Sequence, residues 1–105
     1  MSLLSDESVK SQSGELLHLA AEKAIRYVDN VRERRVSPAP GALAALSSFH
    51  EPLPSGPSNP ADVLEQLDAL GSPATAATTG GRYFGFVTGG MAPAPLAASW
   101  MAAAW

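Results

Sequence analysis

Apolar positions recur every three or four residues between Ser13 and Arg35, and this spacing predicts one amphipathic helix. Ser13 is a suitable N-cap, and Glu15 places a carboxylate in the first turn, where it complements the helix dipole. Residues 1–13 are polar and rich in serine, so we expect them to be a flexible terminus. The apolar stripe consists of Leu17, Ala21, Ala24, Val28 and Val31.

Two shorter helices are predicted in the middle of the chain. Residues 41–49 can form one or two helical turns, whereas residues 51–60 contain four prolines and predict a loop or extended connector. Asn59 is placed to cap the next helix, with Pro60 at its first position and Gly71 at its end. The apolar face of that helix comprises Val63, Leu64, Leu67 and Leu70.

The last quarter of the sequence predicts a strand, a turn and a helix. Residues 82–87 are aromatic and β-branched, and residues 88–90 read Thr-Gly-Gly, which favours a flexible turn. A new apolar helical pattern begins near Pro93 and is still running at Trp105. An exposed helix of alanine and tryptophan needs a covering surface, so we expect the chain to be an N-terminal fragment of a longer protein.

Composition narrows the class of protein. Of the 105 residues, 46% are hydrophobic, which is too many for a disordered chain, although much of this share is alanine, which buries little area. The net charge is −3, and the basic cluster Arg32, Arg34 and Arg35 is interrupted by Glu33, so it indicates a solvated helix end and not a nucleic-acid patch. No cysteine is present, which excludes disulfides and thiolate chemistry.

The beginning of the sequence has no basic flank followed by an apolar run, and no apolar run is long enough for a membrane span. We therefore expect a soluble, cytoplasmic protein that contacts neither membrane nor nucleic acid.

Few residues carry candidate chemistry. His18 and His50 lie far apart without acids at metal-ligand spacing, so no metal site is predicted. Lys10 and Lys23 are expected to be solvated charges. The segment 88–91 fits neither a P-loop nor a dinucleotide fingerprint. It is either a tight turn or a place where backbone approaches a ligand closely. We predict no catalytic, cofactor-binding or metal-binding residue in this chain.

One stretch has a more specific pattern. Residues 81–90 read Gly-Arg-Tyr-Phe-Gly-Phe-Val-Thr-Gly-Gly, and residues 93–105 form an alanine-rich helix with two tryptophans. This combination resembles the group II pyridoxal-phosphate-dependent decarboxylases, which act on aromatic amino acids, tyrosine, histidine or glutamate. The first helix, the proline-rich connector and the helix at 63–70 match in the same order, so the resemblance covers roughly residues 14–105.

The resemblance implies an organisation and an activity for the full-length protein. Residues 14–79 would form a helical dimerisation arm over the partner subunit of a homodimer, and residues 80–105 a substrate entrance and the first part of the next helix. The fragment would be mainly α, and the full-length protein an aminotransferase-like α/β enzyme of fold type I. Such an enzyme uses pyridoxal 5'-phosphate to release carbon dioxide from an L-amino acid.

By position, the resemblance assigns Phe86, Val87, Thr88 and Gly89 to the substrate pocket. Aromatic family members often have bulkier residues where Val87 and Gly89 stand, so the substrate class stays open. For Tyr83, Phe84 and Phe86, packing within the strand is as good an interpretation as a role in the pocket. Two other interpretations remain: a complete helical dimerisation or interaction module, and a decarboxylase-like protein without activity.

Overall fold

The computed structural model describes residues 6–82 and 92–105, and the described part is helical without strands. The prediction of a mainly α chain is thereby confirmed. Of the predicted strand, all but Arg82 falls outside the described residues, as does the turn at 88–90. The α-helices are α1 (Asp6–Asn30), α2 (Pro40–Ala45), α3 (Pro60–Gln66) and α4 (Pro93–Ala104).

Helix α1 differs from its predicted bounds at both ends. It begins at Asp6, so Ser13 lies inside the helix and is not its cap. Neither proline nor glycine stands between Asp6 and Ser13, so this segment contains no residue that interrupts a helix. The helix ends at Asn30, five residues before Arg35, and residues 31–33 form turns.

The end of α1 has a local cause. The Asn30 side-chain amide donates a hydrogen bond to the Arg26 carbonyl at 2.8 Å. The Asn30 carbonyl accepts hydrogen bonds from the backbone N–H groups of Glu33 and Arg34, at 3.0 and 3.1 Å. Asparagine competes in this way for backbone partners and is a poor residue for a helix interior.

The middle of the chain follows the sequence pattern closely. Helix α2 and the 3₁₀-helix η1 (Leu46–Phe49) confirm the predicted helical turns at 41–49. Asn59 caps α3 as expected, because its Oδ1 accepts hydrogen bonds from the backbone N–H groups of Ala61 at 2.9 Å and Asp62 at 3.3 Å. Between these elements, every residue from 51 to 59 is exposed.

Gly71 does not end the helical path. Helix α3 continues as a π-turn, η2 (Leu67–Gly71), and then as a 3₁₀-turn, η3 (Ser72–Ala74). Gly71 has φ −79° and ψ −49°, which is right-handed helical geometry and not the left-handed conformation of a glycine C-cap. The prediction that Gly71 terminates this helix was therefore wrong.

Helix α4 begins at Pro93, as predicted. Ala92 before it is extended, with φ −90° and ψ 140°, and proline is well suited to the first turn of a helix because its missing N–H has no partner there anyway.

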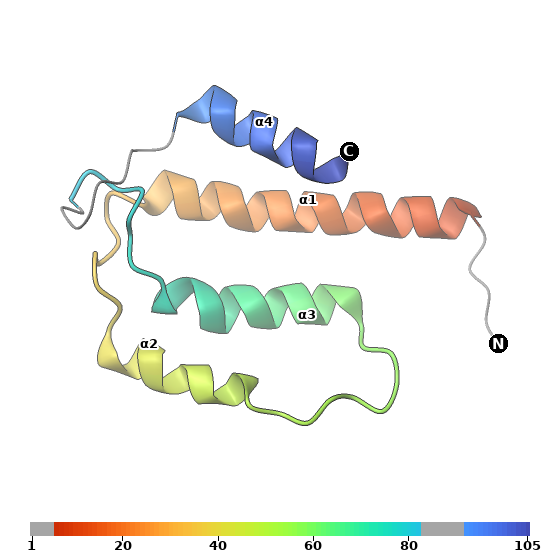
Figure 1. The fold of residues 1–105 in the computed structure, drawn as a ribbon, viewed down its shortest axis with the longest axis horizontal. Helices are drawn as coiled ribbons and strands as arrows, with labels where there is room; N and C mark the ends of the chain where they lie inside the picture. Colours follow the sequence, from red (N-terminus) through yellow and green to blue (C-terminus); the bar gives the residue numbers. More distant parts are fainter. Residues whose placement is uncertain (1–5, 83–91) are drawn as a thin grey trace.

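The helices are arranged around α1, with α4 along one side and α3 along the other, and α2 lies beyond α3 (Figure 1). The molecule measures 52 × 35 × 20 Å. Among the described residues, Ala77 is the one buried hydrophobic residue, at 1% exposure. Its backbone N–H donates to the carbonyl of Val36 at 2.9 Å, which ties the segment after η3 to the segment after α1. The described part of the fold therefore has one buried contact between distant segments but hardly any hydrophobic core.

Candidate functional site

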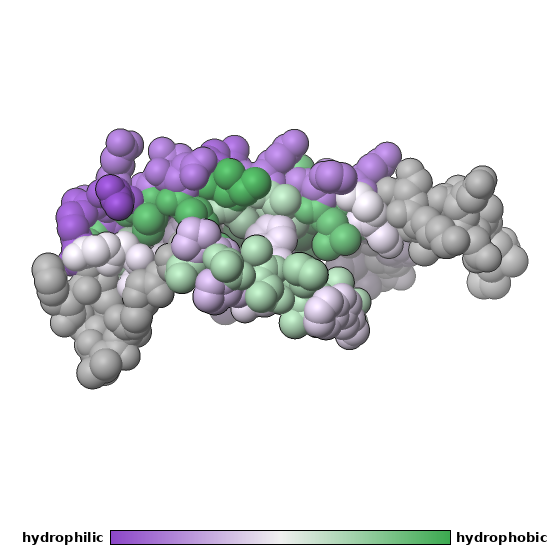
Figure 2. Space-filling view, turned by 90° about the horizontal axis from the view of Figure 1, so that it is seen from above, coloured by the Kyte–Doolittle hydropathy of each residue, from purple (hydrophilic) through white to green (hydrophobic). Residues whose placement is uncertain are grey.

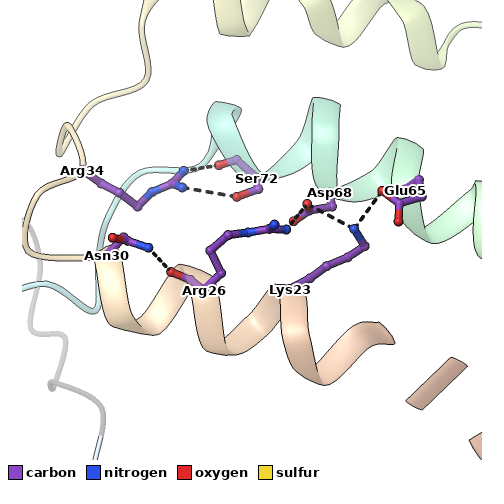
Figure 3. A network of polar contacts seen from close by, with 7 residues as sticks. All are labelled: Lys23, Arg26, Asn30, Arg34, Glu65, Asp68 and Ser72. Atoms are coloured by element: carbon purple, nitrogen blue, oxygen red, sulfur yellow. Dashed lines mark hydrogen bonds and ion pairs between the residues drawn. The ribbon is translucent and has the colours of Figure 1, made fainter. Parts of the chain in front are cut away.

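Two different surfaces flank α1, and the first is a network of polar side chains facing α3. Lys23 Nζ lies 2.9 Å from Glu65 Oε2 and 3.6 Å from Asp68 Oδ2. Arg26 Nη2 lies 3.0 Å from the same oxygen of Asp68, so Asp68 bridges two cations (Figure 3). We call these pairs, with the contacts of Tyr27 and Arg34 described next, the polar seam.

The polar seam continues toward the end of α1. The guanidinium of Arg34 donates to the backbone carbonyl of Ser72 and reaches its hydroxyl at 3.3 Å. The same guanidinium stacks over the Tyr27 ring, 4.2 Å from its centroid, an arrangement favoured by the negative face of the ring. The hydroxyls of Tyr27 and Thr75 share a hydrogen bond of 2.9 Å.

Lys23 is held in its charged state. The hydrogen bond to Glu65 raises the pKa of Lys23 above its ordinary value of 10.5, and the charges of Glu65 and Asp68 act in the same direction, while burial opposes them. Its side chain is 13% exposed. Lys23 is therefore not the unpaired solvated charge that was expected, because its ammonium is paired with Glu65 and Asp68.

This environment is the reverse of what a pyridoxal-phosphate site requires of a lysine. The lysine that bonds the cofactor must lose its proton, which needs a desolvated pocket that lowers its pKa. Lys23 instead has two carboxylates within 3.6 Å that stabilise the ammonium. Lys23 therefore does not fit the cofactor, and no catalytic step follows from it.

The polar seam could not be recognised from one helix alone. On the α1 side, Lys23, Arg26 and Tyr27 lie within one turn of the helix and Arg34 follows its end. The partners at 65, 68, 72 and 75 recur every three or four residues and are acids or hydroxyls. Each stripe alone is typical of a solvated helix face. The one available signal was that the cations at 23 and 26 have the same three-residue spacing as the acids at 65 and 68. These charged partners are 42 residues apart in the sequence.

The second surface is an apolar groove between α1 and α4 with a volume of about 410 Å³. Its single charged lining residue is Asp29. Apolar residues gather along the middle of this side of the molecule, with hydrophilic residues along one edge (Figure 2). The groove is lined mainly by Ala24, Ile25 and Val28 from α1 and by Leu96, Ala97 and Trp100 from α4.

Members of the predicted α1 stripe, among them Ala21, Ala24 and Val28, line this groove, so the stripe does face another helix. The contact is incomplete. Ile25 remains 57% exposed and Trp100 40% exposed, although both line the groove. The groove is thus an apolar surface that the described residues leave largely uncovered.

The residues singled out by sequence are not brought together. Phe86, Val87, Thr88 and Gly89, the predicted substrate pocket, lie outside the described residues. His18 is exposed on α1 and His50 is exposed after η1. Within residues 6–82 and 92–105, no group of three or more His, Asp or Glu side chains could hold a metal ion. No helix in that part of the chain is both long and apolar enough to cross a bilayer.

No family model, curated protein or solved structure matches the chain. The described residues present two surfaces that bear on function. One is the polar seam, which joins α1 to α3 with its charges paired, and the other is the uncovered apolar groove. The groove suits association with another apolar surface.

Proposed function

We propose that this chain is the N-terminal part of a pyridoxal-phosphate-dependent amino acid decarboxylase of group II. In this proposal it acts as a helical arm that lies against the partner subunit of a cytoplasmic homodimer. The full-length enzyme would release carbon dioxide from an L-amino acid, with its cofactor bound by residues outside this chain. The resemblance of residues 81–105 to that family supports the proposal.

The observation that carries the proposal is the amount of surface left uncovered. A compact monomer of 10.8 kDa would expose about 5,500 Å² of accessible surface. This chain exposes 8246 Å², an excess on the order of 2,700 Å². Obligate dimers bury roughly 1,000–2,500 Å² on each partner, so the excess on this one chain is at the upper end of what a permanent interface would remove.

The chain is also extended in a way that suits an arm. Its radius of gyration is 16.7 Å, whereas a compact domain of this length would have about 13 Å. Because the chain is elongated along α1, the polar seam and the apolar groove lie near the surface and few residues are buried. An element of this shape gains most of its burial from a neighbouring body.

Helix α4 has the composition of a buried helix. Residues 92–105 contain no charged side chain. Met101 is 56% exposed and Trp105 is 89% exposed. A helix that is apolar all round is normally surrounded by protein, so this helix supports contact with a larger body on the sides that α1 does not cover.

The substrate entrance is assigned through the family resemblance alone, at Phe86, Val87, Thr88 and Gly89. The small side chain of Val87 would then leave room beside the substrate. In the full-length enzyme, Val87→Phe should raise KM for a bulky amino acid more than for a small one. Steady-state kinetics on both substrates would check this, and equal effects on both would remove Val87 from the entrance.

The coding sequence after Trp105 tests the proposal most simply. It should continue α4 and later encode a lysine preceded by histidine, the context in which this family holds the cofactor. The purified 105-residue chain, mixed with pyridoxal phosphate and amino acids, should release no carbon dioxide and show no imine absorbance. Release of carbon dioxide by the chain alone would contradict the assignment of catalysis to residues outside it.

The uncovered groove equally favours a second function, a self-contained helical dimerisation module. Such a module would form a discrete dimer, whereas an arm without its body would aggregate or remain loosely packed. Light scattering of the purified chain separates these two outcomes. A decarboxylase-like protein without activity would be distinguished by the residues encoded after Trp105.

A further inference from the structure

We infer that α3 is joined to α1 by a hinge at one end and an electrostatic latch along its length, and that ionic strength opens the latch. This conformational device depends only on contacts within the chain. It would operate whether the chain serves as an arm or as a module.

The hinge lies where the segment after η3 is hydrogen-bonded to, and packed against, the segment after α1. Ala77 is buried and bonded to the Val36 carbonyl, and a Cβ at Gly80 would lie 3.4 Å from both Val31 Cγ2 and the Val31 carbonyl oxygen. Arg82 donates to the backbone carbonyl of Arg34. The segment that leads from α1 to α2 and the segment that follows η3 meet at this end of α1 (Figure 1).

The opposite end of α3 has no such tie. Residues 51–59, which lead into α3, are exposed throughout. Figure 1 shows them looping away from α1. Motion about the hinge would therefore move the start of α3 most, and the contacts that oppose this motion are those between the helices themselves.

Those contacts include three ion pairs. Lys23 reaches Glu65 and Asp68, and Arg26 reaches Asp68. Of the apolar residues on this part of the path, Leu64 is half-buried, whereas Val63 is 51% exposed and Leu67 of η2 is 58% exposed. The three ion pairs thus act as the latch, with the Lys23–Glu65 pair farthest from the hinge.

The latch is open to solvent ions on both helices. The side chains of Arg26 and Glu65 are 62% and 58% exposed. The Debye length falls from about 10 Å at 0.1 M salt to about 3 Å at 1 M, so exposed ion pairs weaken over this range. The contacts at Ala77 are buried and uncharged, so the hinge should not respond in the same way.

Distance measurements between paired spin labels test the device directly. The chain has no cysteine, so introduced cysteines label specifically. One pair, His18→Cys with Val63→Cys, reports on the latch end, and a second, Glu33→Cys with Ala76→Cys, reports on the hinge end. All four positions are exposed. Each pair would be measured by double electron–electron resonance between 0.05 and 1 M NaCl.

We expect the latch-end distribution to shift to longer distances and broaden with salt, while the hinge-end distribution stays constant. At low salt, Glu65→Lys should reproduce this opening. Adding Lys23→Glu should reverse it in part, because the exchanged pair attracts again while the new carboxylate at position 23 repels Asp68. Glu15→Lys makes the same change of charge outside the latch and should have no effect. Circular dichroism should show equal helix content throughout.

Two results would overturn the inference. The first is a latch-end distribution that is the same at all salt concentrations. The second is a parallel change at both ends, since that would indicate general unfolding and not rotation about Ala77.

Discussion

The ammonium of Lys23 lies 2.9 Å from one carboxylate and 3.6 Å from another, so its proton is retained more strongly in the folded chain than in the unfolded one. A group whose pKa is raised by folding contributes stability below its unfolded pKa, and that contribution is lost as the pH rises through the folded pKa. For Lys23 the contribution is complete below 10.5 and disappears at higher pH.

Contact between α1 and α3 should therefore be constant from neutral pH to about 10 and weaken above it. Amide exchange in α3, measured at a series of pH values and corrected for intrinsic rates, would show the loss. Lys23→Arg keeps its charge at alkaline pH and should show a smaller loss. If both proteins lose protection identically, Lys23 is not the group responsible.

Ala77 occupies the one fully buried hydrophobic position in the described part of the chain. Its replacement by leucine should force the hinge segments apart, at about 1–3 kcal/mol, the usual cost of overpacking. The neighbouring Ala76 is exposed, so Ala76→Leu is a matched control with little expected effect. Chemical denaturation of both variants provides the comparison, and equal destabilisation would mean that burial at 77 is unimportant.

Some helix boundaries are set by residues close in the sequence, and others by contacts with distant parts of the chain. Asn59 and Pro60 were predicted correctly because the capping hydrogen bonds involve residues only two and three positions away. Gly71 was misjudged because η2 contacts η1, which lies far from it in the sequence, and such tertiary contacts override the preference of glycine for a helix end. The polar seam was missed because it needs two distant stripes to meet.

The Asn59 cap makes a prediction about α3. Asn59→Ala removes the acceptor of the Ala61 and Asp62 amides and should destabilise the start of the helix by about 1 kcal/mol. Hydrogen exchange of these two amides should become several-fold faster, whereas Asn59→Asp should keep them protected. Unchanged exchange in the alanine variant would show that the cap contributes little to α3.

For the molecule as a whole, the sequence predicted that the chain is mainly helical and roughly where its helices lie. It did not predict how the helices pack against one another. The apolar stripe of α1 predicted a covered face, and the structure places α4 beside it without filling the groove. The predicted pocket at 86–89 lies outside the described residues, so it remains a prediction. Sequence periodicity defines which face is apolar, whereas the partner that covers it depends on contacts that no single helix specifies.

Calorimetric unfolding of the isolated chain tests most directly whether its surfaces belong against a larger body. A cooperative domain of 105 residues unfolds near 60 °C with an enthalpy of about 70 kcal/mol. With one buried hydrophobic residue in its described part, this chain should instead show a broad transition with a much smaller enthalpy. A sharp two-state transition with the full enthalpy, from the chain as a monomer, would contradict the account.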